Sequence, residues 1–157
     1  MMMVRLCQDG ATQATLRDSP TVLPEAVEEL LRLDAPFIAI TRTATRDTEI
    51  GGQRIKEGDK VIIYWASANR DEAEFASPER FDPARASNRH LSFGAGPHRC
   101  AGSNLARMNL RIGLSELLGR LDGVRLEDAS AIEYHNTFTR APRTVPIAFT
   151  PGTRVGA

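Results

Sequence analysis

Residues 93–102 read Phe-Gly-Ala-Gly-Pro-His-Arg-Cys-Ala-Gly, and they restrict the fold more than any other part of the chain. Gly94, Gly96 and the proline that follows them favour a shaped loop over regular structure. A helical pattern begins shortly after this loop, which therefore delivers Cys100 to the start of a helix. Unpaired N–H groups and the positive end of the helix dipole favour the thiolate there, and the thiolate is the form that binds metals. The sequence thus predicts Cys100 as a candidate metal ligand.

The residues beside Cys100 suit a flat ligand. Phe93 can shield the sulfur from water, and Gly102, which lacks a side chain, can let a flat macrocycle approach the first helical turn. The alternative is that Cys100 is an ordinary buried cysteine beside a glycine-rich turn. Cys7, the other cysteine, lies far from Cys100 and without CxxC spacing, which argues against a disulfide scaffold or a zinc ribbon.

Charge and hydropathy exclude several classes of protein. The chain of 157 residues has 20 basic and 20 acidic residues, so no net field draws it onto nucleic acid or anionic lipid. The longest apolar runs, Phe37–Ile40 and Val61–Ala66, are far shorter than the roughly 20 residues that a membrane helix needs. Met1–Val4 is too short for the apolar part of a secretory signal. We therefore expect a soluble, cytoplasmic protein without a nucleic-acid or membrane partner.

Hydrophobic periodicity predicts an α+β chain that is mainly helical. Apolar residues at helical spacing predict a helix over about Pro24–Leu33, which Pro36 ends. A small sheet is expected from β segments at Phe37–Arg46, Glu49–Ile55 (with Gly51-Gly52 as its hairpin turn) and Val61–Ala66. Ala68–Arg99 is long, rich in polar and turn residues and without periodicity, which is typical of a functional loop.

A second helix follows the cysteine loop and carries two apolar stripes. One stripe consists of Leu110, Leu114, Leu117 and Leu121, and the other of Leu105, Met108 and Ile112. Two apolar faces predict a buried helix. Alternating apolar residues then predict a closing strand over Thr144–Thr150, after the segment Leu126–Tyr134.

The stretch Phe93–Gly102 resembles the haem-ligand signature of the cytochrome P450 family: Phe, two residues, Gly, one residue, His or Arg, one residue, Cys, one residue, Gly. Leu105-Ala106-Arg107 is also similar to the family. The resemblance implies that residues 1–157 are the C-terminal, haem-binding portion of one P450 domain. The distal oxygen-binding helix and everything upstream of it would then be absent from this sequence. It further implies that Cys100 is the axial ligand of the iron in haem b.

Two further segments resemble the family in the expected order. Glu29-Leu30-Leu31-Arg32 is similar to its Glu-x-x-Arg helix motif, and Phe75–Phe81 is similar to the segment that supplies a second arginine. The resemblance implies a buried triad of Glu29, Arg32 and Arg80 that locks the loop before Cys100. Without the cysteine motif, Glu29 and Arg32 would be read as an exposed pair worth about 0.2–0.5 kcal/mol.

Resemblance also assigns the side chains that hold the haem propionates. His98 and Arg42 match positions at which the family holds the two haem propionates, and an arginine fork suits a carboxylate. The alternative for Arg42 is a solvated strand residue. A basic patch of Arg99, Arg107 and Arg111 is expected to dock an electron donor, the alternative being salt-bridged surface arginines. His90 and His135 belong to no motif and are expected at the surface.

The resemblance implies a monooxygenase that inserts one oxygen atom from O2 into a small apolar substrate. Electrons would come from NAD(P)H through a reductase and a ferredoxin-type donor. The pocket walls would come from Pro36–Ile40 and the turn near Thr137–Phe138. Two alternatives stay open: a truncated, non-catalytic remnant that binds haem at most, and a Cys-His hydrolase, for which no nucleophile-base signature is present.

Overall fold

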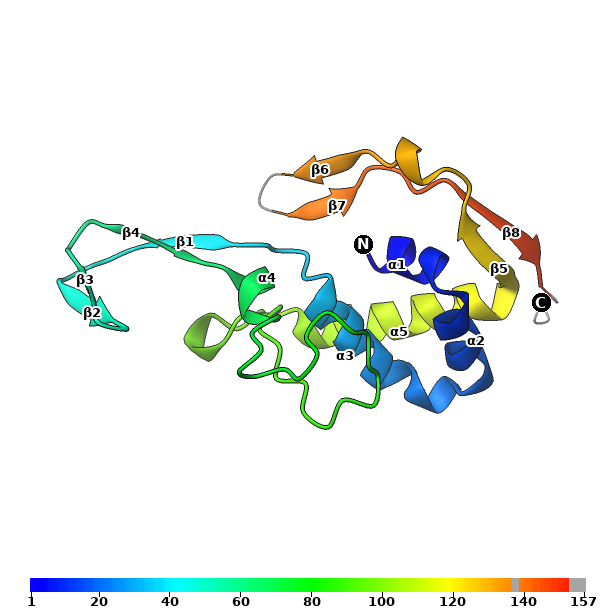
Figure 1. Cartoon of the computed structure of the whole chain (residues 1–157), viewed down its shortest axis with the longest axis horizontal. Helices are drawn as coiled ribbons and strands as arrows, with labels where there is room; N and C mark the ends of the chain where they lie inside the picture. Colours follow the sequence, from blue (N-terminus) through cyan, green and yellow to red (C-terminus); the bar gives the residue numbers. More distant parts are fainter. Residues whose placement is uncertain (137–138, 153–157) are drawn as a thin grey trace.

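The computed structural model describes residues 1–136 and 139–152, which form a helical body with a long β arm (Figure 1). The α-helices are α1 (Met2–Gln8), α2 (Gly10–Asp18), α3 (Leu23–Leu33), α4 (Trp65–Ala68) and α5 (Ser103–Arg120). Short 3-10 turns are η1 (Pro20–Val22), η2 (Gly96–His98) and η3 (Ala129–Ala131). The strands are β1 (Ile40–Thr43), β2 (Thr48–Ile50), β3 (Gln53–Ile55), β4 (Lys60–Ile63), β5 (Leu121–Leu126), β6 (Tyr134–Asn136), β7 (Arg140–Pro142) and β8 (Ile147–Pro151).

The hydrophobic core lies where α3 meets the other helices. The predicted helix over Pro24–Leu33 is confirmed as α3, which starts one residue earlier. Its fully buried residues Ala26, Val27 and Leu30 pack in one cluster with Leu114 and Leu118 of α5. Burying one such leucine stabilises the fold by about 1.5–3 kcal/mol, so this cluster fixes how α3 and α5 lie against each other.

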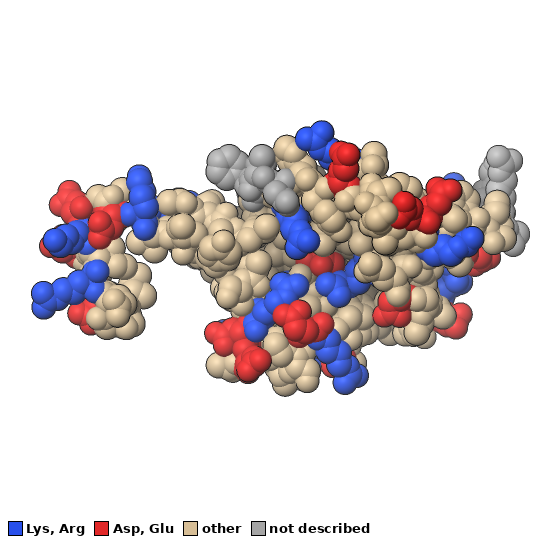
Figure 2. All heavy atoms as spheres, turned by 45° about the horizontal axis from the view of Figure 1, so that its top comes forward, with Lys and Arg blue, Asp and Glu red and all other residues tan. Residues whose placement is uncertain are grey.

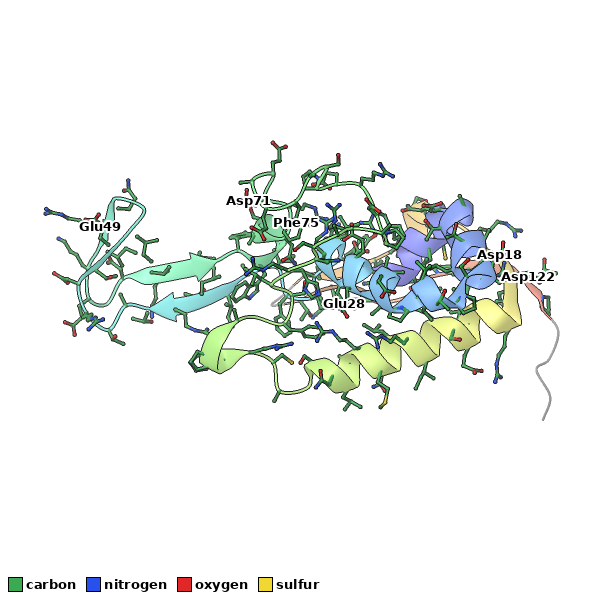
Figure 3. All side chains as sticks on the ribbon, turned by 90° about the horizontal axis from the view of Figure 1, so that it is seen from below. Asp18, Glu28, Glu49, Asp71, Phe75 and Asp122 are labelled. Carbon is green, nitrogen blue, oxygen red and sulfur yellow. The ribbon has the colours of Figure 1, made fainter. Side chains whose placement is uncertain are left out.

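The predicted burial of α5 is correct in part for the first of its two apolar stripes: Leu114 is buried, and Leu110 and Leu117 pack against the core while partly buried. Leu118, which neither predicted stripe included, is also buried, whereas Leu105, Met108 and Ile112 are 57%, 51% and 56% exposed. The predicted burial of the second stripe is therefore wrong. No other element of the described chain covers that side of α5, and its side chains point away from the body (Figure 3). The stripe is therefore an apolar surface of this chain.

The arm consists of two separate ladders instead of the predicted small sheet. β1 pairs with β4 in antiparallel register, Ile40 opposite Ile63, and β2 pairs with β3 at its tip. The predicted Gly51-Gly52 turn is confirmed, with φ angles of 56° and 78° that favour glycine. The strand predicted over Val61–Ala66 is wrong beyond Ile63, because the chain turns into α4 at Trp65.

The C-terminal part closes the fold with two further antiparallel ladders. The predicted closing strand is confirmed as β8, which pairs with β5 rather than with the arm. Gln13 of α2 is buried and donates from its amide nitrogen to the carbonyl oxygens of Leu6 and Val124, 2.6 Å each, so it joins α1 and β5. Mixed helices and short ladders confirm the α+β class, while the loop Ala68–Arg99 is almost wholly irregular, as predicted.

Charged side chains of both signs are interspersed on the face shown in Figure 2, and they gather on the tip of the arm around β2 and β3. The even mixture matches the balance of 20 basic and 20 acidic residues in the sequence. Among the described residues, no helix is long and apolar enough to cross a membrane.

Candidate functional site

The cysteine loop folds as the sequence predicts. Gly94 and Gly96 have φ angles of 68° and 67°, a conformation that residues with a side chain rarely adopt. The Cys100 N–H donates to the Phe93 carbonyl oxygen at 2.8 Å, which closes the loop on itself. Helix α5 starts three residues after Cys100, and Gly102 precedes it without a side-chain cap. Cys100 is exposed, so its thiol is accessible beside the free N–H groups of a helix start.

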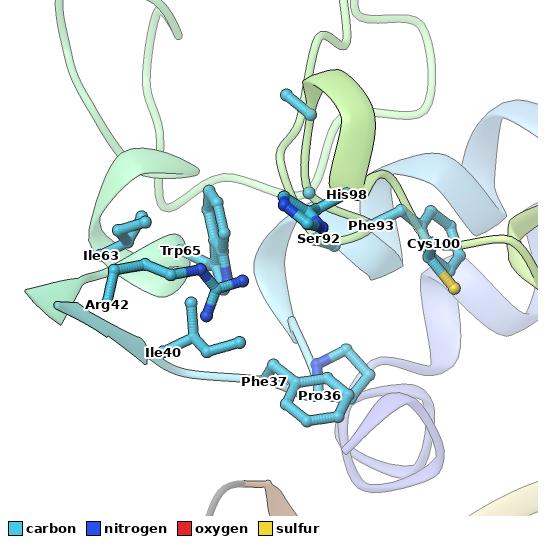
Figure 4. Close-up of a pocket in the computed structure, with 12 residues that line it drawn as sticks. Pro36, Phe37, Ile40, Arg42, Ile63, Trp65, Ser92, Phe93, His98 and Cys100 are labelled. Carbon is cyan, nitrogen blue, oxygen red and sulfur yellow. The ribbon is translucent and has the colours of Figure 1, made fainter. Parts of the chain in front are cut away.

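A cavity of about 350 Å³ lies between the cysteine loop and the base of the β arm (Figure 4). It is lined by Pro36, Phe37, Ile40, Arg42, Ile63, Trp65, Ser92, Phe93, Gly94, Ala95, His98 and Cys100. Arg42 stands on the side of the arm, Cys100 lies at the opposite end, and His98 lies between them. The sequence predicted five of these residues as site residues and the Pro36–Ile40 segment as a wall.

The remaining predicted loop residues shape this site from outside the cavity lining. A β-carbon on Gly102 would lie 3.9 Å from the Cys100 sulfur, so the glycine keeps the space beside the thiol open. Gly96 is the first residue of η2 and is exposed. The turn near Thr137–Phe138, predicted as another wall, lies outside the described residues.

The donor set fits a prosthetic group better than a bare metal ion. Within residues 1–136 and 139–152, no cluster of three or more His, Cys, Asp or Glu side chains could hold a metal. A lone thiol therefore suits a metal that brings its other ligands with it. Apolar walls fit a flat ring, and Arg42 and His98 fit anionic groups at its edge. Cys7 is a poor ligand, because burial raises the pKa of its thiol.

Glu29 and Arg32 form a fully buried ion pair on one face of α3. Arg32 donates from Nε and Nη2 to the two Glu29 oxygens at 2.8 and 2.7 Å, and both side chains are 0% exposed. Arg32 also donates from Nη1 to the carbonyl oxygens of Asn69 and Pro78. Burial opposes the charge of Glu29, but the hydrogen bonds and the charge of Arg32 outweigh burial and lower its pKa. The pair therefore holds the irregular loop against α3.

The third member of this cluster is Arg85, and the prediction of Arg80 is wrong. Arg85 Nε lies 3.2 and 3.3 Å from the two Glu29 oxygens, and the Arg85 side chain is 9% exposed. Arg80 is exposed and contributes its backbone carbonyl oxygen, which accepts from Arg32 Nη2 at 3.3 Å. The loop turns between Ser77, which has a φ of 49°, and Phe81, and this path carries Arg80 outward.

Asn69 is a buried organising residue that the sequence analysis missed. It is 0% exposed, and its side chain donates to the Arg32 carbonyl oxygen and the Ser92 hydroxyl and accepts from the Leu91 N–H. Ser92 in turn donates to the Leu31 carbonyl oxygen at 2.7 Å. Asn69 thus joins the end of α3 to the residues directly before Phe93. Its only sequence signal is an asparagine in a polar segment, which resembles an ordinary turn.

The predicted basic patch divides in the structure. Arg99 is exposed, whereas Arg107 makes two hydrogen bonds to Glu28, at 2.7 and 2.8 Å, and Arg111 has a buried Nε. The salt-bridged alternative therefore holds for Arg107.

The prediction that His90 lies at the surface is also wrong, because its side chain is 2% exposed and its Nε2 lies 3.1 Å from Glu28.

The structure thus brings together an accessible cysteine before a helix, an apolar cavity, and the side chains of Arg42 and His98 that line it. The profile of the cytochrome P450 family matches residues 5–144. Cytochrome P450-terp from Pseudomonas sp is 40% identical over 147 residues, which cover 94% of this chain and 34% of that protein. Linalool 8-monooxygenase from Pseudomonas putida is 38% identical, with 94% and 36% covered. The chain belongs to the cytochrome P450 family.

Solved structures agree with this assignment. The heme domain of CYP116B5 from Acinetobacter radioresistens superimposes with a TM-score of 0.90 at 30% sequence identity, over 95% of this chain and 36% of that one. The chain spans about a third of the length of the curated relatives that it matches. The resemblance seen in residues 93–102 is thereby confirmed as family membership and as a portion of the P450 fold.

Proposed function

We propose that residues 1–157 form the haem-binding part of a cytochrome P450 domain and that Cys100 is the thiolate ligand of the haem iron. The observation that carries the proposal is one cavity that brings Cys100 and His98 of the cysteine loop together with Arg42 of β1. Cys7 is buried within α1, whereas Cys100 is exposed, lines this cavity and lies just before the start of α5. Haem b bound there would supply the iron chemistry that activates O2, with the thiolate favouring O–O cleavage.

The chain's own residues would have five tasks in this site. Cys100 binds the metal, and the glycines of its loop hold the sulfur open to the cavity. Arg42 and His98 bind the two carboxylates at the edge of the ring. Phe93 covers the sulfur, while Phe37 and Ile40 give an apolar wall that orients a substrate and excludes water.

The whole reaction proposed for a protein of this kind is monooxygenation of a small apolar substrate. Linalool 8-monooxygenase and 20-oxo-5-O-mycaminosyltylactone 23-monooxygenase, relatives at 38% and 45% identity, are named as monooxygenases. Apolar lining at Pro36, Phe37 and Ile40 supports a substrate of apolar character. We propose a ferredoxin-type donor with its NAD(P)H-dependent reductase as electron source, docking near the exposed Arg99.

Replacing Arg42 or His98 with Ala is expected to speed haem loss by roughly tenfold or more, since each charge-assisted hydrogen bond to a carboxylate contributes about 1.5–3 kcal/mol. The thiolate-type spectrum should stay unchanged, because neither residue binds the iron. The measurement is transfer of haem from the loaded chain to an excess of an acceptor protein. Arg46, an arginine just beyond β1 and outside the cavity lining, gives the matched control Arg46→Ala. Equal rates of haem loss in the unmodified chain and in the three variants at Arg42, His98 and Arg46 would remove Arg42 and His98 from the site.

A second candidate function is haem binding without turnover by these 157 residues alone. It is favoured by the exposed stripe of Leu105, Met108 and Ile112 and by a chain that spans about a third of its relatives. We expect no oxidation of apolar substrates above free haem, because one wall of a pocket neither positions a carbon atom nor keeps water out. The assay supplies haem, a surrogate reductase and ferredoxin, and NADPH. Turnover that Cys100→Ala abolishes would contradict this expectation.

A further inference from the structure

Glu28 and Glu29 are adjacent on α3, yet they hold different parts of the chain. Glu29 accepts hydrogen bonds from Arg32, Arg85, the Asp82 N–H and the Asn88 amide, all on α3 or in the loop at 82–88. Glu28 accepts instead from Arg107 of α5 and lies 3.1 Å from His90, directly before the cysteine loop. Figure 3 shows Glu28 on the side of α3 that faces α5. Glu29 therefore holds the loop at 82–88 against α3, whereas Glu28 holds His90 and Arg107 of α5.

The partners of Glu28 frame the ring of Phe93. The guanidinium carbon of Arg107 lies 4.6 Å from the Phe93 ring centroid, and the His90 ring centroid lies 6.0 Å from it. Both bonds of the Arg107 fork go to Glu28, so this cation is fixed in orientation over the ring. The Ser92 N–H donates to His90 Nδ1 at 3.2 Å, so neutral His90 carries its proton on Nε2 and donates it to Glu28.

Phe93 connects these contacts to Cys100. Its carbonyl oxygen accepts from the Cys100 N–H at 2.8 Å, and its side chain lines the cavity beside the thiol. Gly94, the next residue, donates from its N–H to the Leu91 carbonyl oxygen at 2.9 Å, within the same turn. A displacement of Phe93 would therefore move both the backbone that closes the loop and the ring that lines the cavity beside the thiol.

We propose that Glu28 is a positioning residue for the Cys100 thiolate: it clamps Arg107 and His90 around Phe93, and Phe93 fixes the ligand loop. This inference rests on the proposed role of Cys100 as ligand. The charge state supports it, since burial opposes ionisation of Glu28 but the hydrogen bonds of His90 and Arg107 prevail and lower its pKa to about 2. Glu28 is thus an anion at neutral pH, as the clamp requires.

The test compares Glu28→Gln with Glu25→Gln, a control on the exposed side of the same helix. In the chain without haem, amide hydrogen exchange at Cys100 and Gly94 should speed up by roughly tenfold or more in Glu28→Gln, the loss expected for a charged hydrogen bond. Exchange at Asp82, whose N–H is held by Glu29, should match the control. Arg107→Lys, which keeps the charge but loses the two-bond fork, should give the same local pattern if Glu28→Gln folds poorly.

The haem-loaded chain gives a second readout that simple destabilisation would not move. At equal haem content, Glu28→Gln should show a smaller share of the thiolate-type band in the reduced carbon-monoxide complex than Glu25→Gln. Unchanged exchange at Cys100, or equal acceleration at Cys100 and Asp82, would overturn the role of Glu28. Failure of every form to take up haem would contradict the proposed function instead, while the exchange comparison would still decide the role of Glu28.

Discussion

Glu29→Gln is expected to destabilise the chain by about 3–5 kcal/mol, the usual cost of breaking a buried ion pair from one side. The substitution leaves the Arg32 and Arg85 guanidiniums without a counter-charge beneath the loop, where the Arg32 side chain is 0% exposed. That cost is a large share of the roughly 5–15 kcal/mol that stabilises a typical domain. We therefore expect Glu29→Gln to prevent haem incorporation as well as to lower the urea midpoint in far-ultraviolet circular dichroism.

The arginines of the loop give a matched pair of controls for this prediction. Arg85→Gln removes a guanidinium that contacts Glu29 and should cost about 1.5–3 kcal/mol, the range for a hydrogen bond to a charged group. Arg80→Gln removes an exposed side chain and leaves the backbone carbonyl oxygen in place, so its effect should stay within about 0.5 kcal/mol. A Glu29→Gln variant as stable and as fully haem-loaded as the unmodified chain, or equal effects at Arg80 and Arg85, would show the cluster to be superficial.

Local features of the fold could be predicted from the sequence because neighbouring residues determine them. The spacing of Glu29 and Arg32 places both side chains on one helix face, and the two form an ion pair there in the structure. Gly51-Gly52 forms the predicted turn, and the glycines at 94 and 96 shape the predicted loop through their own backbone angles. The cavity likewise joins Cys100 to residues that a motif singled out.

Features that depend on the path of irregular backbone could not be predicted in this way. The motif pointed to Arg80, but the backbone path through the turn at Ser77 leaves Arg80 exposed and brings Arg85 to Glu29. His90 lacks a motif, yet it is buried because Glu28 and Ser92 meet its two ring nitrogens. The two apolar stripes of α5 have the same spacing, and only the packing of α3 against one of them distinguishes the buried face from the exposed one.

The most direct measurement of the central proposal is the absorption spectrum of the haem-loaded chain after reduction and addition of carbon monoxide. Cys100 lines the cavity at a helix start, and Cys7 is buried on α1, so the two cysteines give a matched pair of variants. We predict a thiolate-type band in the unmodified chain and in Cys7→Ala, and its complete loss in Cys100→Ala. Persistence of the band in Cys100→Ala, or its absence from the unmodified haem-loaded chain, would contradict ligation by Cys100.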